Sequence, residues 1–459
     1  MSNRVGSLRR SSYSSSSSSL RRSSVSSRDI TAIQQALLRQ RPISNYTVVV
    51  LIALLPWLSF FLLYSIHTHQ GALWETISSL LFRWPFLVSA IPPFFDVVAW
   101  KILVVFASCQ LLLYEVLPRD TVVIVNGGTS ETTTKETNGL SCTVVICLAY
   151  VLGATLKLYR PDLIYQHFPG IVAALSIIAV VSTFLLYVNY HFGDTYSVDT
   201  VYEFFFGLEL EPRIVEIEIK HFIRSRITMG LYALYLVSAL YYSHGQGKGL
   251  HHTVSIMGMA HLFYILCWQW CEEVQLNGID AKIVTLGFGR FWLDLVLYPV
   301  LLTSPVAIVV MERSHISPIF AAIILCITFI STVFVYITAR QKLNFRLHKG
   351  NVKIGGHDPY FIMAKYRAEG GDTMANLLLG SGYWGACRHP SYSFDIVVHL
   401  CFSLLGGWSG PIGHAPFIVI LLYYVIRISF DETRCLAKYG PSWGQHCARV
   451  HYRLIPGVY

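Results

Sequence analysis

The chain contains few charged residues. Asp, Glu, Lys and Arg make up 13% of its 459 residues, about half of the roughly 25% that is usual in a soluble domain. Hydrophobic residues make up 54%, and the mean hydropathy is +0.50. This composition excludes an ordinary soluble globular protein. The 14% share of aromatic residues suits the belts that line both interfaces of membrane proteins, so we expect an all-α bundle of transmembrane helices.

Several familiar kinds of site are also missing. The ten cysteines do not form a close CxxC pair, which argues against a zinc site or a disulfide framework. His251, His252 and His261 lack the spaced partners that a metal site needs, so no metal is expected. Serine, rather than an apolar segment, follows the first arginines, and this pattern does not resemble a signal peptide.

Residues 1–45 form a basic arm that is poor in apolar residues. Serine occupies 14 of the first 28 positions, and residues 1–41 carry eight arginines and one aspartate. Such a segment buries too little apolar surface to offset its ordering entropy, so we expect a disordered arm. The arm either binds nucleic acid, an acidic protein or anionic lipid, with phosphorylation as a switch, or only sets membrane topology.

We expect the remaining residues, 46–459, to form one multi-span membrane domain. Runs that suit a ~30 Å hydrocarbon core, some of them short for a full span, predict ten spans: Thr47–Ile66, Val97–Leu117, Leu140–Lys157, Gly170–Tyr190, Ile227–Tyr242, Val254–Trp270, Phe291–Met311, Pro318–Ile337, Tyr392–Trp408 and Pro416–Ile428. Trp84–Phe95 contains Pro92 and Pro93 and suggests an interfacial or re-entrant segment.

The distribution of basic residues gives an orientation for these spans. Lys and Arg collect in cytoplasmic loops, and a cytoplasmic arm with eight spans before Arg340 also places two basic segments in the cytoplasm. These segments are Pro212–Arg226 and Arg340–Lys353. We therefore expect a cytosolic or nucleoplasmic N-terminus.

The densest group of polar residues lies between Lys342 and Tyr459. Lys342 and Arg346 share a face if their segment is helical, as do Arg427 and Asp431. Together with Arg388 and His389 these cations suit a multiply charged phosphate ligand, and Tyr383-Trp384 could stack on its base or nicotinamide ring. A cytoplasmic fringe of positive charge would give the same pattern.

Four sequence blocks resemble the sterol reductase family, which includes Δ14-sterol reductase, 7-dehydrocholesterol reductase, sterol C24 reductases and the lamin B receptor. The blocks, between about Tyr202 and Tyr459, are YEFFFGLELEPRI, GYWGACRHPSY, RISFDETRCLAKYG and the closing YRLIPGVY. The Arg-Ser arm favours the branch of Δ14-sterol reductase and the lamin B receptor.

The resemblance implies an NADPH site in the cofactor half, about residues 340–459. The implied cofactor-binding residues are Lys342, Arg346, Tyr383, Trp384, Arg388, His389, Ser391, Arg427, Asp431 and Tyr439. Ser391 replaces the family's asparagine, and Phe430 replaces a signature arginine. The second change removes a charge-assisted contact of a kind that is typically worth about 1.5–3 kcal/mol.

Reduction of a ring double bond of this type needs an acid to protonate one carbon and a hydride donor to attack its neighbour. Ionisable residues inside a membrane are candidates by default; those selected are Glu272, Glu273, Asp294 and Tyr264, with Asp280, Tyr202 and Glu203 as further candidates. For Glu272 and Glu273 the alternative is a carboxylate pair at a helix end. Cys267, Val284 and Leu302–Pro305 depart from the family's polar pattern.

Two functions remain open at this point. The first is NADPH-dependent reduction of a sterol ring double bond, Δ14 above others, at the endoplasmic reticulum. The second is a weakly active or inactive tether of the inner nuclear membrane, like the lamin B receptor, whose arm contacts chromatin, nucleic acid or lamin. Membrane lipid surrounds the chain in both.

Overall fold

The computed structural model describes residues 43–82, 91–125, 132–191, 199–245, 252–312, 316–367, 373–407 and 410–459. Residues 1–42 of the basic arm, His251, Trp408 and most of the Trp84–Phe95 segment lie outside these ranges, so the expectations for them stay predictions. The described chain is mostly helical, as the composition indicates.

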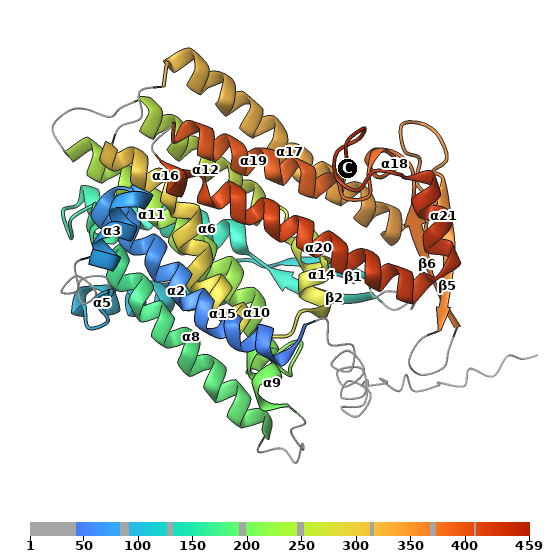
Figure 1. Cartoon of the computed structure of the whole chain (residues 1–459), viewed down its shortest axis with the longest axis horizontal. Helices are drawn as coiled ribbons and strands as arrows, with labels where there is room; N and C mark the ends of the chain where they lie inside the picture. The colour runs from blue at the N-terminus through green and yellow to red at the C-terminus, as the bar shows by residue number, and fades with distance from the viewer. Residues whose placement is uncertain are drawn as a thin grey trace, which may run out of the picture. The chain divides into compact units, whose positions relative to one another are not determined.

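Ten helical segments coincide with the ten predicted spans (Figure 1). They are α2 (Asn45–His69), α5 (Val97–Val116), α6 (Gly139–Thr155), α8 (Phe168–His191), α10–η1–α11 (Ile219–Phe222, Ile223–Thr228, Met229–Gly245), α12 (His252–Trp270), α15–η2–α16 (Phe288–Trp292, Leu293–Leu297, Tyr298–Glu312), α17 (Pro318–Leu347), α19 (Pro390–Leu405) and α20 (Ala415–Tyr439). In the described ranges, six of these segments are long and apolar enough to cross a membrane by themselves.

Shorter helices and three two-stranded antiparallel sheets connect the spans. The helices are α3 (Leu73–Phe82), α7 (Leu163–Gln166), α9 (Thr200–Phe206), α13 (Glu272–Leu276), α14 (Ile279–Ile283), α18 (Tyr383–Ala386), η3 (Pro411–His414) and α21 (Pro441–Arg449). The sheets pair β1 (Asp120–Val125) with β2 (Thr132–Thr137), β3 (Arg213–Ile214) with β4 (Ile217–Glu218), and β5 (Phe361–Arg367) with β6 (Thr373–Leu379).

The span from Phe288 to Met311 forms the centre of the bundle, because 94% of its apolar window is buried, against 33% for α2 and 22% for α5. Two π-helical segments, η1 and η2, pack against each other on neighbouring spans. A π-helical turn shifts the side chains that follow it and often accompanies a functional site. Here the two turns carry Arg224 and Asp294.

One end of the bundle is rich in charged contacts, and we call it the charged face. It is the end where α2 begins and where α8, α12, α17 and α20 finish. Asn45 donates to Asp199 (2.6 Å), and Arg340 pairs with Glu273 (2.6 Å). The predicted basic segments Pro212–Arg226 and Arg340–Lys353 both lie here, although the first is partly helical, since α10 begins at Ile219.

The C-terminal third contributes small sheets and short helices to this face. Helices α17, α19 and α20 lie side by side and lead to β5–β6, α18 and α21 (Figure 1). Trp384 Nε1 donates to the Thr338 carbonyl (2.8 Å), and Asn376 Nδ2 donates to Tyr439 Oη (2.8 Å). These bonds fix α18 on α17 and β6 on the end of α20.

Candidate functional site

The last turns of α17 place two cations on one side of the helix. Lys342 and Arg346 are both half-buried, and α17 continues through them to Leu347, so they do share one face. Lys342 Nζ lies 3.8 Å from the centre of the Trp384 ring, an attractive cation–π contact. Tyr383 lies next in the chain, and its backbone N–H donates to Gln341 (3.1 Å).

The Arg388-His389 segment is held by the end of the chain. The backbone N–H groups of both residues donate to the carbonyls of Tyr452 (2.9 Å) and Arg453 (3.0 Å). Arg388 also donates to the Val450 carbonyl (2.8 Å) and to Glu432 (2.5 Å). These contacts fix the backbone that presents His389 and, one residue into α19, the half-buried Ser391.

Arg427 links the cofactor half to the preceding half of the domain. Its Nε donates to Tyr392 Oη (3.1 Å), and its Nη2 lies 2.5 Å from Asp280 Oδ1. Asp280 is also paired with Arg290 (3.5 Å). Burial tends to raise the pKa of Asp280, but the charges of Arg427 and Arg290 outweigh burial and hold that pKa well below its usual range.

The cationic cluster, which we define as the cations Lys342, Arg346, Arg388 and Arg427 together with the ring of His389, has unused hydrogen-bonding capacity. Within the described ranges, buried atoms without a hydrogen-bond partner include Arg346 Nε, Arg388 Nε, His389 Nε2, His446 Nδ1 and Asp431 Oδ2. Most buried polar atoms are hydrogen-bonded, so these atoms suit a polar ligand.

The charge of the cluster indicates the sign of that ligand. Burial, followed by the charges of Lys342, Arg388 and Arg427, lowers the pKa of His389 to about 3. Burial and the charges of Lys342 and Arg388 lower the pKa of His446 to about 4. A group of cations that repel further protons favours an anion, and the residues present therefore fit the phosphates of a dinucleotide.

Three stacked rings lead from this cluster into the bundle. The His389 ring lies parallel to Tyr392, with centres 5.1 Å apart, and Tyr392 stacks on Tyr424 at 4.3 Å. Tyr424 Oη then donates to Asp395 Oδ2 (2.5 Å). Asp395 lies within α19 and is 7% exposed.

Asp395 also accepts a hydrogen bond from a predicted catalytic residue. Tyr264 Oη, on α12, donates to Asp395 Oδ1 (3.3 Å), and Tyr264 is 4% exposed. The Tyr264–Asp395 pair thus lies in the buried interior, and Tyr424 joins it to the stacked rings of the cationic cluster.

Asp395 and Tyr424 are absent from the sequence-based prediction. A signal for Asp395 was present, since it is the single carboxylate of the membrane helix α19, and such residues are functional candidates. It lies three residues after the Arg-His-Pro-Ser-Tyr block, whose residues the resemblance assigns to cofactor binding.

The structure places Glu272 in a dense network of donors instead of beside Tyr264. Glu272 pairs with Arg226 (2.6 Å), contacts Ser225, lies 3.2 Å from His221 and accepts from the Gly139 N–H (2.9 Å). Burial opposes ionisation, but the hydrogen bond from His221 and the charges of His221 and Arg226 hold the pKa of Glu272 well below its usual range. Glu272 is therefore an ionised carboxylate near neutral pH.

The other two predicted carboxylates are also paired. Asp294, 1% exposed, lies 3.0 Å from Arg224 and 2.6 Å from Arg290. Glu273 pairs with Arg340 at the charged face. Of the four predicted catalytic residues, Tyr264 is the one that the structure brings next to the rings of the cofactor half.

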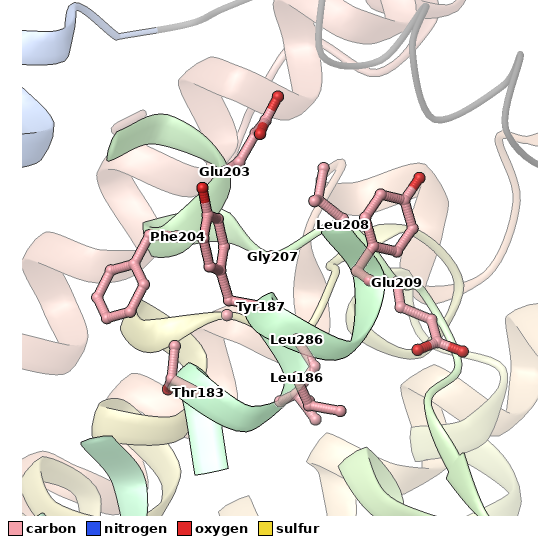
Figure 2. Close-up of a pocket in the computed structure, with 11 residues that line it drawn as sticks. Thr183, Leu186, Tyr187, Glu203, Phe204, Gly207, Leu208, Glu209 and Leu286 are labelled. Carbon is pink, nitrogen blue, oxygen red and sulfur yellow. The ribbon is translucent and has the colours of Figure 1, made fainter. Parts of the chain in front are cut away.

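Two hollows open near the charged face. The smaller, about 320 Å³, lies between α8, α9 and the turn at Gly207, with Tyr187, Phe204 and Glu203 around it (Figure 2). The larger, about 400 Å³, is lined by charged residues that include Lys220, His221, Arg224, Asp280 and Arg290. Because Asp280 also binds Arg427, the larger hollow borders the cationic cluster.

Known proteins match nearly all of the membrane domain. Residues 46–459 match the model of the ergosterol biosynthesis ERG4/ERG24 family. The 7-dehydrocholesterol reductase of Arabidopsis thaliana is 27% identical over 396 residues, which is 85% of this chain and 90% of that protein. The same enzyme of Danio rerio is 27% identical over 388 residues (80% and 81%). The Delta(14)-sterol reductase of Methylotuvimicrobium alcaliphilum is 27% identical over 263 residues (56% and 58%).

Proposed function

The chain belongs to the ergosterol biosynthesis ERG4/ERG24 family, and on this premise we propose that it reduces a carbon–carbon double bond of a sterol. Relatives of this chain are named as 7-dehydrocholesterol and Delta(14)-sterol reductases, which supports the reaction class. We further propose that NADPH is the reductant and that the bond is the C14–C15 double bond.

The observation that carries the proposal is the continuity between the cationic cluster and the Tyr264–Asp395 pair. His389, Tyr392 and Tyr424 stack in sequence, and Tyr424 hydrogen-bonds Asp395. Anion-binding groups at the charged face are thereby joined to an acid in the apolar interior, and a sterol reductase needs both.

Each part has a distinct role in the proposed reaction. NADPH, when bound, supplies the hydride. Lys342, Arg346 and Arg427 would hold its phosphates, because their charges concentrate at one face and Arg346 Nε lacks a partner in the described ranges. The Tyr264–Asp395 pair would hold the proton that goes to one alkene carbon, and the proton belongs to the pair because the two groups share a hydrogen bond.

The carboxylates predicted as acids take another role in this proposal. Glu272 pairs with Arg226, and Asp294 pairs with Arg224 and Arg290, so guanidinium groups already occupy both carboxylates. They would instead fix the helices that surround the reaction site.

The test uses purified protein in lipid nanodiscs with NADPH and, in parallel, 7-dehydrocholesterol or a Δ14-sterol. We expect NADPH consumption and one reduced product with the Δ14-sterol, and a loss of at least tenfold in kcat for Tyr264→Phe, since general acids contribute about 10²- to 10⁴-fold. Reduction of 7-dehydrocholesterol alone would replace the Δ14 assignment. No reduction of either sterol by folded protein that binds NADPH would refute reductase activity on both.

A further inference from the structure

Asp280, on the short helix α14, joins two arginines that belong to different parts of the domain. Its Oδ1 lies 2.5 Å from Nη2 of Arg427, on α20, and its Oδ2 lies 3.5 Å from Nη1 of Arg290, on α15. Arg290 is in turn held by Asp294 (2.6 Å), which is 1% exposed. Asp280 therefore connects Arg427 to the buried centre of the bundle.

Arg427 is contacted through each of its three side-chain nitrogens. Nε donates to the Tyr392 hydroxyl (3.1 Å), and Nη1 donates to the Tyr423 hydroxyl. Nη2 lies against Asp280, which is the ion-pair partner of Arg427 in the described part of the chain. A guanidinium carries five N–H groups in one plane, so these three contacts fix the plane and still leave donors for a ligand.

The contacts around Arg427 do not cancel its charge. One network joins three arginines to two aspartates: Arg224, Arg290, Arg427, Asp280 and Asp294. Because the network has one more cation than carboxylates, a surplus of positive charge remains. Arg427 thus stays attractive to an anion while its side chain is held in place.

A held arginine binds phosphate better than a mobile one. An arginine side chain loses rotamer freedom when it binds a ligand, and contacts that fix it beforehand reduce this loss. Its fork must also face the ligand, because phosphate accepts two parallel N–H···O bonds from it. Tyr392 and Tyr423 supply neutral contacts, whereas Asp280 supplies a charged one, which is the stronger kind.

We propose that Asp280 is a positioning residue for cofactor binding: it holds the guanidinium of Arg427 in the orientation that serves the phosphates of NADPH. Asp280 acts through Arg427 and adds no contact of its own to the cofactor. It does so from the half of the domain that precedes the cofactor half. This inference rests on the proposed function, which assigns NADPH as the reductant.

The first measurement is the Kd of NADPH, by calorimetric titration of nanodisc-embedded protein up to millimolar NADPH in the absence of sterol. Asp280→Asn removes the charge and keeps the size of the side chain, so we expect binding at least tenfold weaker. Asp162→Asn is the matched control, because Asp162 pairs with Arg160 at 3.0 Å and its side chain is 15% exposed, against 29% for Asp280. It lies between α6 and α7 and should change the Kd less than twofold.

Double variants test whether Asp280 acts through Arg427. In an Arg427→Met background, Asp280→Asn should weaken binding less than a further twofold, because the side chain that Asp280 holds is gone. In an Arg346→Met background, Asp280→Asn should still weaken binding at least tenfold, because variants that act independently are additive. A general structural effect of Asp280→Asn would weaken binding equally in both backgrounds.

Three results would overturn the inference. An unchanged Kd for Asp280→Asn would show that Arg427 needs no such support. Tighter binding would show that Asp280 competes with the phosphates for Arg427. An equal loss in the two backgrounds would assign Asp280 a structural role alone.

Thermal unfolding without NADPH checks that each variant is folded. If Asp280→Asn is not, Asp280→Asn with Arg290→Gln restores the local balance of charge and takes its place in the same comparison. Wild-type protein that is folded and does not bind NADPH would instead refute the proposed cofactor, so the two failures are distinguishable.

Discussion

Glu272 offers the sharpest test of how the buried charges act. It is 3% exposed, and its partner Arg226 is 1% exposed. Glu272→Gln removes the negative charge but leaves Arg226 buried within 2.6 Å of the former carboxylate oxygen. Removing one member of a buried ion pair typically costs about 3–5 kcal/mol, so we expect a loss of stability of this size.

The adjacent residue provides a matched control. Glu273 pairs with Arg340 at the same distance of 2.6 Å, but the two side chains are 38% and 41% exposed. Exposed ion pairs contribute about 0–1 kcal/mol, so Glu273→Gln should change stability by no more than that. The two variants remove the same charge at consecutive positions and differ mainly in burial.

Equilibrium unfolding of both variants in mixed detergent micelles measures the difference. A Glu272→Gln variant that unfolds within about 1 kcal/mol of Glu273→Gln would refute the assignment of Glu272 as a buried structural charge. The double variant Glu272→Gln/Arg226→Met should recover part of the loss, because it removes the unpaired cation as well.

The contribution of Glu272 to the stability of the folded chain depends on pH in a defined direction. The pKa of Glu272 is lower in the folded chain than its ordinary value near 4.5. Its contribution is therefore complete above about pH 4.5 and is lost as the pH falls below that value, because the unfolded chain then binds a proton that the folded chain refuses. Glu272→Gln should flatten this part of the stability curve.

Four further predictions follow from individual contacts. Arg346→Met should weaken NADPH binding at least tenfold in a fluorescence titration, while Lys349→Met, three residues later and exposed, should change it less than twofold. His446→Gln should reduce the loss of stability between pH 6.5 and 4, since the lowered pKa of about 4 makes the folded chain refuse a proton there, at up to about 1.4 kcal/mol per pH unit. Gly207→Ala should lower expression or stability sharply, because Gly207 has φ +81° and its new methyl would clash with the Leu286 carbonyl; Gly245→Ala, with open space around it, should be tolerated. Tyr424→Phe should lower kcat more than NADPH affinity, because it removes the 2.5 Å bond to Asp395 and keeps the stacked ring.

The positions of the spans were predictable because long apolar runs leave few alternatives in a bilayer. It was also predictable that Lys342 shares a helical face with Arg346, and Arg427 with Asp431. Residues four positions apart lie on the same side of a helix. The stacking of His389 on Tyr392 and Tyr424 joins α19 to α20, and no local pattern specifies which rings of two helices will meet.

The partners of the buried carboxylates were the least predictable part. Arg224 and Arg226 belong to a basic segment that topology alone explains as a loop, yet α10 and η1 carry them into the bundle, where they pair with Asp294 and Glu272. A sequence shows that a charge lies near the membrane, but its pairing depends on the packing of distant helices. That pairing decides whether a carboxylate is ionised or is able to donate a proton.

The same consideration explains why the acid is assigned to Asp395 with Tyr264. In the described ranges, ion pairs with arginine hold Glu272, Glu273, Asp280 and Asp294, whereas Asp395 is surrounded by the hydroxyls of Tyr264 and Tyr424 and by His399. An arginine partner commits a carboxylate to an ion pair, whereas the hydroxyl partners of Asp395 leave it free to exchange a proton with them. The arginines of η1, α15, α17 and α20 thus separate the ion-paired carboxylates from Asp395, whose described partners are two hydroxyl groups and an imidazole ring.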